Sequence, residues 1–474
     1  MNNENTICAI ATAPGGALGI IRVSGNEAID ITDNIFSPIG KDQRKLSERD
    51  AYTLTFGNII DKENGGEIVD EVLVSIFRAP HSYTGEDSTE ISCHGSAYIL
   101  QRVMQLLISN GCRAAAPGEY TERAFLNGKM DLSQAEAVAD LIASRSKAAH
   151  RIAMNQMRGA FSEELALLRN KLLHLTSLME LELDFSDHEE LEFADRSELS
   201  AVAQQIRDVI KRLADSFRIG NAIKNGVPVA IVGETNAGKS TLLNQLVGEE
   251  RAIVSDIHGT TRDVIEDTID IQGITFRFID TAGIRDTADK IESIGIERTM
   301  QKISQAEIVL MLIDSTQAEA QLDELWPKVI PLCEEKNVVI VFNKSDITAV
   351  TPSALIAKYR NNGIAAPSHI DSICISARTG DGIDSLRQLL CSSSSVDAAS
   401  ASGAIVSTLR HLDALNASLS DIERVIDGLD SSLPSDLISQ DLRSCLYHLG
   451  EITGGEIQTD EVLGNIFRHF CVGK

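Results

Sequence analysis

Aromatic residues, basic residues, paired cysteines and long apolar runs are all scarce in this chain of 474 residues. Aromatic residues make up 4% of it, so its cores must consist mainly of Leu, Ile, Val and Ala, which suits helices packed on helices or on parallel sheets. Lys and Arg total 43 against 69 Asp and Glu, a net charge of -26. This charge argues against a protein that coats nucleic acid by bulk electrostatics, although a local basic patch stays compatible with it.

The eight cysteines form no CxxC pair and show no metal-ligand spacing, which predicts reduced thiols in a cytosolic protein. The segment Met1–Asn5 lacks the basic residues of a signal peptide. Apolar runs reach only about six residues, whereas a helix that spans a bilayer needs about 20. The sequence therefore predicts a cytoplasmic protein that does not enter a membrane.

The distribution of proline and glycine divides the chain into regions with different predicted secondary structure. Residues 6–128 mix short β-type runs with Gly and Pro turns, which predicts an α+β domain. From 132 to 219 there is no Pro and one Gly, and Leu, Ala and Ile recur at helical spacing, which predicts long helices. Strand-like and helix-like segments then alternate to about residue 390, as in a parallel sheet wound by helices.

Helical periodicity resumes after a Ser/Ala-rich connector, so helical regions flank the α/β region on both sides. This arrangement indicates an insertion, because insertions are tolerated where chain ends lie close together. The predicted fold class is multidomain α/β plus α, in which an inserted α/β domain interrupts a helical domain. The predicted domains are an N-terminal α+β domain at 1–128, a first helical part at 129–221, the inserted domain at 222–390, and a linker with the second helical part and a terminal CVGK tail at 391–474.

A phosphate-binding loop begins the inserted domain. The apolar run at 229–232 leads into Gly-Glu-Thr-Asn-Ala-Gly-Lys-Ser-Thr at 233–241 and then into a helix-like segment, which is the order strand, loop, helix. Its glycines let backbone N–H groups turn toward phosphates, Lys239 supplies a positive charge to the outer phosphates, and Ser240 offers an oxygen to Mg²⁺. An ordinary Gly-rich turn before a surface helix is the alternative, and it leaves Lys239 unexplained.

Further motifs follow at predicted strand ends. Asp-Thr-Ala-Gly at 280–283, Asn-Lys-Ser-Asp at 343–346 and Ser-Ala at 376–377 each come directly after a strand-like run. The Asp346 carboxylate can accept hydrogen bonds from the ring N–H and the amino group of guanine, whereas adenine presents no such pair. Because ligands of this fold class bind at the carboxyl ends of the strands, the inserted domain is predicted to be a Ras-like P-loop GTPase domain.

The sequence also predicts how the nucleotide is surrounded. The position that holds a water-orienting Gln in small Ras-like GTPases is Ile284 here, which has no polar group. The segment 255–263 is the expected switch loop, in which Thr261 joins Ser240 as a Mg²⁺ ligand, and an ordinary polar loop is its alternative. The expected GTP-binding residues are Asn236, Ala237, Gly238, Lys239, Ser240, Thr241, Ser255, Asp256, Ile257, His258, Gly259, Thr260, Thr261, Asp280, Thr281, Ala282, Gly283, Asn343, Lys344, Asp346, Ser376, Ala377 and Arg378.

The phosphate loop and the switch loop resemble those of potassium-activated GTPases. The shared features are Gly-x-x-Asn-x-Gly-Lys-Ser at 233–240 and Asp-Ile-x-Gly-Thr-Thr-Arg-Asp at 256–263. The resemblance implies that K⁺ takes the place of an arginine finger, where a cation offsets the charge that develops on the phosphates. It assigns the K⁺ ligands to Asn236, Ser255, Ile257 and Thr260.

Motifs outside the nucleotide domain point to one family. The runs SYTGED at 82–87, PGEYTERAFLNGK at 117–129 and CVGK at 471–474 resemble those of the MnmE (TrmE) family of tRNA uridine-modifying GTPases, and the match covers essentially the whole chain. The resemblance implies a folate-binding N-terminal domain that forms a homodimer. It implies joint action with the flavoprotein MnmG (GidA), in a heterotetramer or larger assembly, on carbon 5 of the wobble uridine of certain tRNAs. The added group is aminomethyl or carboxymethylaminomethyl, and the donor is 5-formyl- or methylene-tetrahydrofolate.

The same resemblance assigns roles to single residues. Glu292 becomes a catalytic acid for GTP hydrolysis, and Cys471 acquires a role in the modification chemistry. Each role has a structural alternative. Glu292 also fits a solvated glutamate at a helix start, and Cys471 fits an inert buried thiol. Arg22 and Lys129 could equally form surface salt bridges. The folate contacts are assigned to Arg22, Glu90, Lys129 and Lys474.

The chain departs from the family pattern at Glu234-Thr235, at His258 and at Val472, none of which removes an expected ligand. Glu234 adds a negative charge beside the phosphate loop, and His258 adds a titratable group to the switch loop. A competing hypothesis is a regulatory GTPase that recruits a ribosome or an assembly partner without folate chemistry. A prenylated switch, modified at Cys471, is disfavoured because the last residue is Lys and no polybasic run precedes the tail.

Overall fold

A computed structural model of the chain describes residues 5–13, 15–62, 64–184, 196–248, 267–279, 303–360, 367, 369–394, 404–431 and 433–455. The chain forms two compact units. The first contains Met1–Ile142, Gln156–Ile206 and Ala417–Lys474, and the second contains Ala143–Asn155 and Arg207–Asn416. Each unit has its own hydrophobic core.

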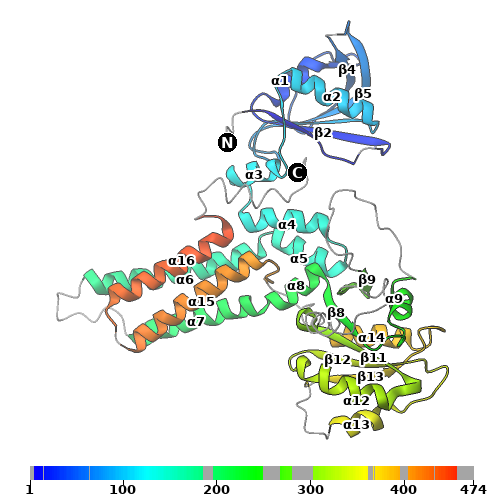
Figure 1. Ribbon diagram of the computed structural model, residues 1–474. Helices are drawn as coiled ribbons and strands as arrows, with labels where there is room; N and C mark the ends of the chain where they lie inside the picture. The colour runs from blue at the N-terminus through cyan, green and yellow to red at the C-terminus, as the bar shows by residue number, and fades with distance from the viewer. Residues whose placement is uncertain are drawn as a thin grey trace. The chain divides into compact units, whose positions relative to one another are not determined.

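The first unit contains a seven-stranded sheet in the order β3-β4-β5-β6-β2-β1-β7. Strands β2, β4 and β5 of this sheet are labelled in Figure 1. Neighbouring strands are antiparallel except β1 and β7, which are parallel. Side chains alternate along each strand, so Val72, Val74 and Ile76 of β5 share one face and pack with Leu100 and Val103 of α2. The elements are β1 (Ile7–Ile10), β2 (Leu18–Ser24), α1 (Ala28–Ile35), β3 (Phe36–Pro38), β4 (Leu54–Asp61), β5 (Glu67–Phe77), β6 (Ser88–His94), α2 (Ala97–Ser109) and β7 (Arg113–Ala114).

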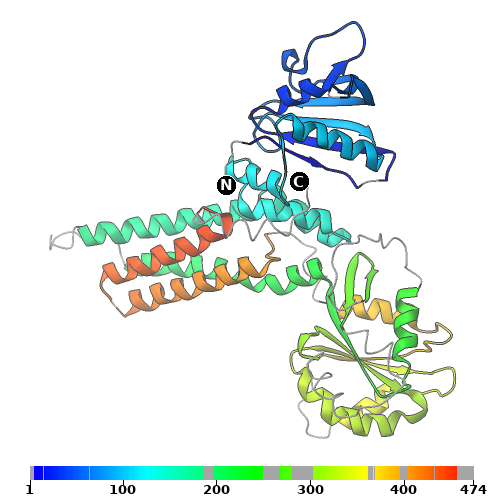
Figure 2. The same cartoon turned by 45° about the horizontal axis from the view of Figure 1, so that its top comes forward.

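Long helices form the rest of the first unit. The buried apolar residues in the described part of α6 are Phe161, Leu165, Leu168, Leu172, Leu175 and Met179, which recur every three or four positions and so line one side of the helix. Helix α16 has the same spacing, and the two helices lie side by side (Figure 2). The helices are α3 (Glu119–Leu126), α4 (Leu132–Ala143), α6 (Ala160–Asp184) and α16 (Ser435–Thr453), while α5 (Lys147–Met157), α7 (Arg196–Asp215) and α15 (Leu409–Asp430) belong partly to each unit.

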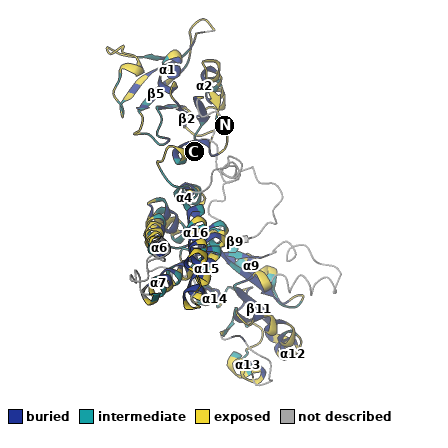
Figure 3. Ribbon diagram, turned by 90° about the vertical axis from the view of Figure 1, so that its left-hand side faces the viewer, coloured by how far each residue is buried: buried dark blue, intermediate teal, exposed yellow. Residues whose placement is uncertain are grey.

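The second unit contains a six-stranded sheet in the order β13-β12-β11-β8-β10-β9, parallel except between β9 and β10. The central strand β11 is buried along its whole length (Figure 3). Leucines of α9 and α14 pack in one core, and residues of α12 and α13 pack in another, so helices cover both faces. The elements are α8 (Phe217–Asn225), β8 (Val227–Val232), α9 (Lys239–Gly248), β9 (Asp267–Ile271), β10 (Ile274–Phe278), β11 (Ile308–Asp314), α12 (Ala318–Val329), β12 (Asn337–Asn343), α13 (Pro352–Arg360), β13 (Ile370–Cys374) and α14 (Ile383–Ser393).

The predicted fold class is confirmed. The N-terminal region is α+β, long helices follow it, and a doubly wound α/β domain of the P-loop type stands between helical segments. Within the described ranges, no helix combines the length and the apolar character that crossing a bilayer requires.

Candidate functional site

The phosphate loop joins β8 to α9 at the carboxyl edge of the sheet. Asn236 (φ 67°) and Gly238 (φ 100°) adopt left-handed backbone conformations that curve the loop. A Cβ added to Gly233 would lie 2.5 Å from the carbonyl oxygen of Leu312 in β11, and one added to Gly238 would collide with the Asn343 side-chain amide. Glycine at these two positions therefore lets the loop lie directly against the neighbouring strand ends.

The ammonium group of Lys239 lies inside the curve of this loop. Its Nζ donates hydrogen bonds to the carbonyl oxygens of Gly233 (2.6 Å) and Glu234 (2.8 Å). Ser240 and Thr241 follow on the first turn of α9 and are exposed. These positions fit the predicted roles, in which Lys239 faces phosphate oxygens and Ser240 supplies an oxygen to Mg²⁺ at a helix N-terminus.

Asn343 joins the phosphate loop to two other strand ends. Its side chain is buried, with 3% exposed, and its Nδ2 donates to the Ala237 carbonyl at 2.8 Å. Its Oδ1 accepts a hydrogen bond of 2.9 Å from the backbone N–H of Ala377. The backbone N–H of Ser345 also donates to the Ile375 carbonyl at 3.1 Å. The structure therefore brings together three sequence motifs that are more than 30 residues apart.

Lys344 and Asp314 form an ion pair at the ends of adjacent parallel strands. Lys344 has a positive φ of 64°, and its Nζ lies 2.5 Å from Asp314 Oδ2. Thr316 donates to Asp314 Oδ1 from both its backbone N–H and its hydroxyl. Burial acts to raise the pKa of Asp314, but the hydrogen bonds from Lys344 and Thr316 outweigh it and hold that pKa below its ordinary value.

The residues predicted to recognise the base lie beside this ion pair in the fold. Asp346 is exposed in the loop after β12, where its carboxylate is accessible to a ligand. Ser376 and Ala377 are buried after β13, and Arg378 is exposed. Several predicted site residues lie outside the described residues, namely Ser255, Asp256, Ile257, His258, Gly259, Thr260, Thr261, Asp280, Thr281, Ala282, Gly283, Glu292, Cys471 and Lys474.

In the N-terminal sheet, Arg22 of β2 lies directly opposite Glu90 of β6. The Nε and Nη2 atoms of Arg22 donate to Glu90 Oε1 at 2.9 and 2.7 Å. The guanidinium carbon lies 5.5 Å from the ring centroid of Tyr83 and 5.7 Å from that of Tyr120, which is within cation–π range. Two predicted folate contacts are therefore neighbours, and two aromatic rings flank them.

Lys129, the third predicted folate contact in the described residues, lies along the loop that carries Tyr83. Its Nζ donates to the Pro80 carbonyl at 2.8 Å, and a Cβ built on Gly85 would lie 3.4 Å from its side-chain methylenes. Lys129 is exposed, so its ammonium group is accessible to a ligand. The loop at 80–87 thus contacts Lys129 and also carries Tyr83, whose ring lies beside Arg22.

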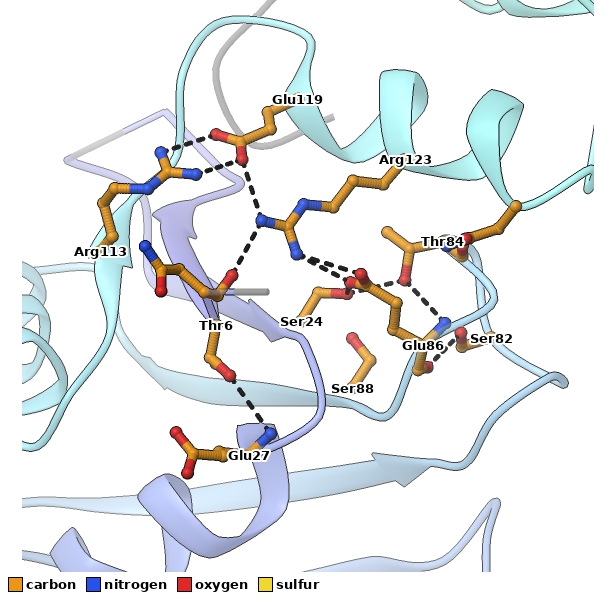
Figure 4. Close-up of polar contacts among 12 residues, drawn as sticks. Thr6, Ser24, Glu27, Ser82, Thr84, Glu86, Ser88, Arg113, Glu119 and Arg123 are labelled. Carbon is orange, nitrogen blue, oxygen red and sulfur yellow. Dashed lines mark hydrogen bonds and ion pairs between the residues drawn. The ribbon is translucent and has the colours of Figure 1, made fainter. Parts of the chain in front are cut away.

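Two sequence motifs of the N-terminal region meet in a buried polar network (Figure 4). Arg123, whose side chain is 1% exposed, donates to both carboxylate oxygens of Glu86 at 3.1 Å and to Glu119 Oε1 at 3.0 Å. Glu119 also pairs with Arg113 at 2.5 Å. Burial acts to raise the pKa of Glu119, but hydrogen bonds from Arg113, from a backbone N–H and from Arg123 hold it below 4.5.

Sequence reasoning missed the residues that support these sites. Arg123 and Glu119 were recognised only as parts of a motif, and their contacts show that they connect the 117–129 segment to the 82–87 loop. Asp314 ends a long apolar run, which is a signal for a residue at the carboxyl edge of a parallel sheet. Gln321, which is buried in α12 and contacts Glu234, lies in an ordinary helical sequence that carries no such signal.

The phosphate loop, its lysine, and the asparagine that joins it to the Asn-Lys-x-Asp and Ser-Ala loops define a P-loop GTPase. Comparisons with known proteins agree with this class and also identify the family. Residues 6–129 match the family model described as GTP-binding protein TrmE N-terminus, and residues 132–471 match the MnmE helical domain. The chain belongs to the MnmE family.

Relatives of this chain match it over their full length. Two proteins named tRNA modification GTPase MnmE are 61% identical (Bacteroides fragilis strain YCH46) and 62% identical (Bacteroides thetaiotaomicron), each with 100% of both chains covered. The protein of the same name from Porphyromonas gingivalis is 50% identical, with 100% of this chain and 98% of that protein covered.

Proposed function

We propose that this chain is a potassium-activated GTPase that, with the flavoprotein MnmG, modifies carbon 5 of the wobble uridine of certain tRNAs, using a tetrahydrofolate one-carbon donor. The coarser part of this statement, GTP hydrolysis in tRNA modification, follows from membership of the MnmE family. The finer part concerns the donor, the cation and the partners, and each has its own support.

The observation that carries the folate assignment is the Arg22–Glu90 pair between Tyr83 and Tyr120. A pterin ring is flat, and it presents an amino group and a ring N–H on one edge, which suit a carboxylate acceptor such as Glu90. Tyr83, which is partly exposed, can pack against the ring, and Arg22 and Lys129 suit carboxylates or polar ring atoms of the ligand. The residues present therefore fit a reduced folate, which would supply the one-carbon unit when bound.

The proposed potassium site involves Asn236 of the phosphate loop. This residue is exposed and has a left-handed backbone at the outer turn of the loop, so its side-chain oxygen is accessible to a cation beside the phosphates. The other proposed ligands, Ser255, Ile257 and Thr260, lie outside the described residues. A cation held there would offset negative charge that develops during hydrolysis.

The remaining proposals concern assembly and location. We propose that the N-terminal domain at 1–128 binds folate and forms a homodimer, that the GTPase domain at 222–390 is inserted between helical parts at 129–221 and 391–474, and that the protein works in the cytoplasm. The net charge of -26 supports a division of labour in which MnmG supplies much of the positive surface that contacts tRNA.

The experiment that tests the folate assignment is calorimetric titration of the full chain with 5-formyltetrahydrofolate. Wild type should bind with saturation, and Arg22→Ala and Lys129→Ala should each weaken binding by about tenfold or more, because each removes a charged partner of the ligand. Lys41→Ala, which removes an exposed lysine of the same domain, is the matched control and should bind like wild type.

Two outcomes separate the competing functions. Binding that is lost in both site variants, while GTP hydrolysis persists, supports one-carbon chemistry on this chain. No folate binding by a folded wild-type protein that hydrolyses GTP would overturn the folate assignment and favour the regulatory GTPase.

A further inference from the structure

Glu234 puts a carboxylate into the phosphate loop of an enzyme whose substrate carries several negative charges. Like charges at short range weaken binding, so the direction of this side chain matters. Glu234 Oε2 accepts a hydrogen bond of 2.9 Å from Nε2 of Gln321, which lies 87 positions further along the chain in α12. The structure therefore shows the Glu234 carboxylate held against α12.

Gln321 is itself fixed at both ends of its amide group. The residue is buried, with 3% exposed, and its Oε1 accepts a hydrogen bond of 2.8 Å from the backbone N–H of Asp314. A backbone N–H can only donate, so the amide oxygen must face Asp314 and the NH₂ group must face Glu234. The orientation of Gln321 thus follows from its two partners.

These contacts form a continuous path across the nucleotide site. Gln321 connects Glu234, in the phosphate loop, with Asp314, whose carboxylate pairs with Lys344 of the Asn-Lys-Ser-Asp motif. Glu324, one turn further along α12, lies beside Glu234 and pairs with Lys328 at 2.8 Å. Gln321 therefore supplies a neutral hydrogen-bond donor to the Glu234 carboxylate and an acceptor to the backbone of Asp314.

We propose that Gln321 is a positioning residue for the guanine nucleotide. It holds the Glu234 carboxylate on α12 and ties the phosphate loop to the strand end that supports base recognition. The inference rests on the guanine-nucleotide site described above and adds to it a residue that touches neither phosphate nor base. It also explains how the chain accommodates an acidic residue in its phosphate loop.

A swap of the two side chains tests this role. Gln321→Glu keeps the acceptor for the Asp314 N–H but replaces the donor to Glu234 with a second carboxylate, so binding of a fluorescent GDP analogue should weaken by about tenfold. Adding Glu234→Gln restores one donor and one acceptor between the two positions, and affinity should return to within about threefold of wild type. Thermal unfolding of each full-length variant confirms that it is folded.

The control is Gln317→Glu, the same substitution at the exposed residue that precedes α12, which should leave affinity unchanged. Wild-type affinity in Gln321→Glu, or a double variant that binds no better than Gln321→Glu, would overturn the proposal. A purely structural role for Gln321 predicts the latter result, because Glu234→Gln would then not repair the defect. Failure of wild type to bind any guanine nucleotide would instead refute the nucleotide site itself.

Discussion

The Asn343 side-chain amide donates a hydrogen bond of 2.8 Å to the Ala237 carbonyl, and so the Asn-Lys-Ser-Asp motif fixes the phosphate loop directly. The Oδ1 atom of Asn343 also accepts a hydrogen bond from the backbone N–H of Ala377. Loops that follow β8, β12 and β13 are therefore held by one buried side chain.

Asp346→Asn should change which base the chain binds. Guanine offers two donors to the Asp346 carboxylate, and an amide replaces one acceptor with a donor, so GTP affinity should fall by at least about tenfold. Xanthine carries a carbonyl where guanine carries the amino group, so XTP should bind better to the variant than to wild type. Competition of both nucleotides against a fluorescent GDP analogue measures this, and unchanged preference would remove Asp346 from the base site.

Asn236→Ala should abolish stimulation by potassium. If Asn236 is a K⁺ ligand, phosphate release by wild type should be faster in KCl than in NaCl at equal ionic strength, and the variant should show equal rates in the two salts. Thr235→Ala, at the exposed neighbouring position, is the control and should keep the stimulation. Equal rates in wild type would contradict the potassium proposal as a whole.

Arg123→Met should destabilise the N-terminal region strongly. The substitution removes a buried guanidinium that pairs with the partly buried Glu86 and with the buried Glu119, which then keeps only Arg113. Breaking a buried ion pair typically costs about 3–5 kcal/mol. Urea unfolding, followed by a probe in the N-terminal region, measures the loss. Arg44→Met removes an exposed arginine whose ion pair is also exposed, and it should have little effect. If the two variants lose a similar amount of unfolding free energy, the network around Arg123 contributes little to stability.

Glu119→Gln should make stability less sensitive to acid. The pKa of Glu119 is below its ordinary value of 4.5 in the folded chain, so the ionised carboxylate stabilises the fold above pH 4.5 and this contribution is lost as pH falls through the folded value. The stability difference between wild type and variant should therefore be greatest near neutral pH and shrink below pH 4.5. Thermal unfolding of both proteins at a series of pH values measures this stability difference. A difference that stays constant from neutral pH to below pH 4.5 would contradict the prediction.

Buried thiols should resist alkylation in the native protein. Burial raises the pKa of Cys93 and Cys333 to about 11 and that of Cys445 to about 12, so very little reactive thiolate forms at pH 8. Mass spectrometry after iodoacetamide treatment should find these residues unmodified in folded protein and modified in urea. Rapid labelling of the folded chain would show that the sites open frequently.

Local patterns predicted much of the fold. The apolar run before the phosphate loop became β8, and the stretch without proline at 132–219 became α4 to α8. Spacing of leucines every three or four residues gave the packed side of α6, because side chains at those intervals share one face of a helix. The apolar runs before the 233–241, 343–346 and 376–377 motifs also became strands, namely β8, β12 and β13. The contacts of these motifs with phosphate and guanine remain predictions.

Contacts between distant segments were not predictable in this way. Glu234 meets Gln321, and Arg123 meets Glu86, only because packing of helices on sheets brings them together. The pairing of β1 with both β2 and β7 is likewise a property of the whole sheet. The sequence shows that Glu234 adds a carboxylate to the phosphate loop, but its partner Gln321 is visible only in the structure.

The hydrogen bonds from Lys239 to the Gly233 and Glu234 carbonyls have a kinetic consequence. They hold the phosphate loop in its curved form from within, so we expect nucleotide to bind without a separate step in which the loop becomes ordered. Association should then depend on diffusion and on the transfer of the ammonium group from carbonyl to phosphate oxygens.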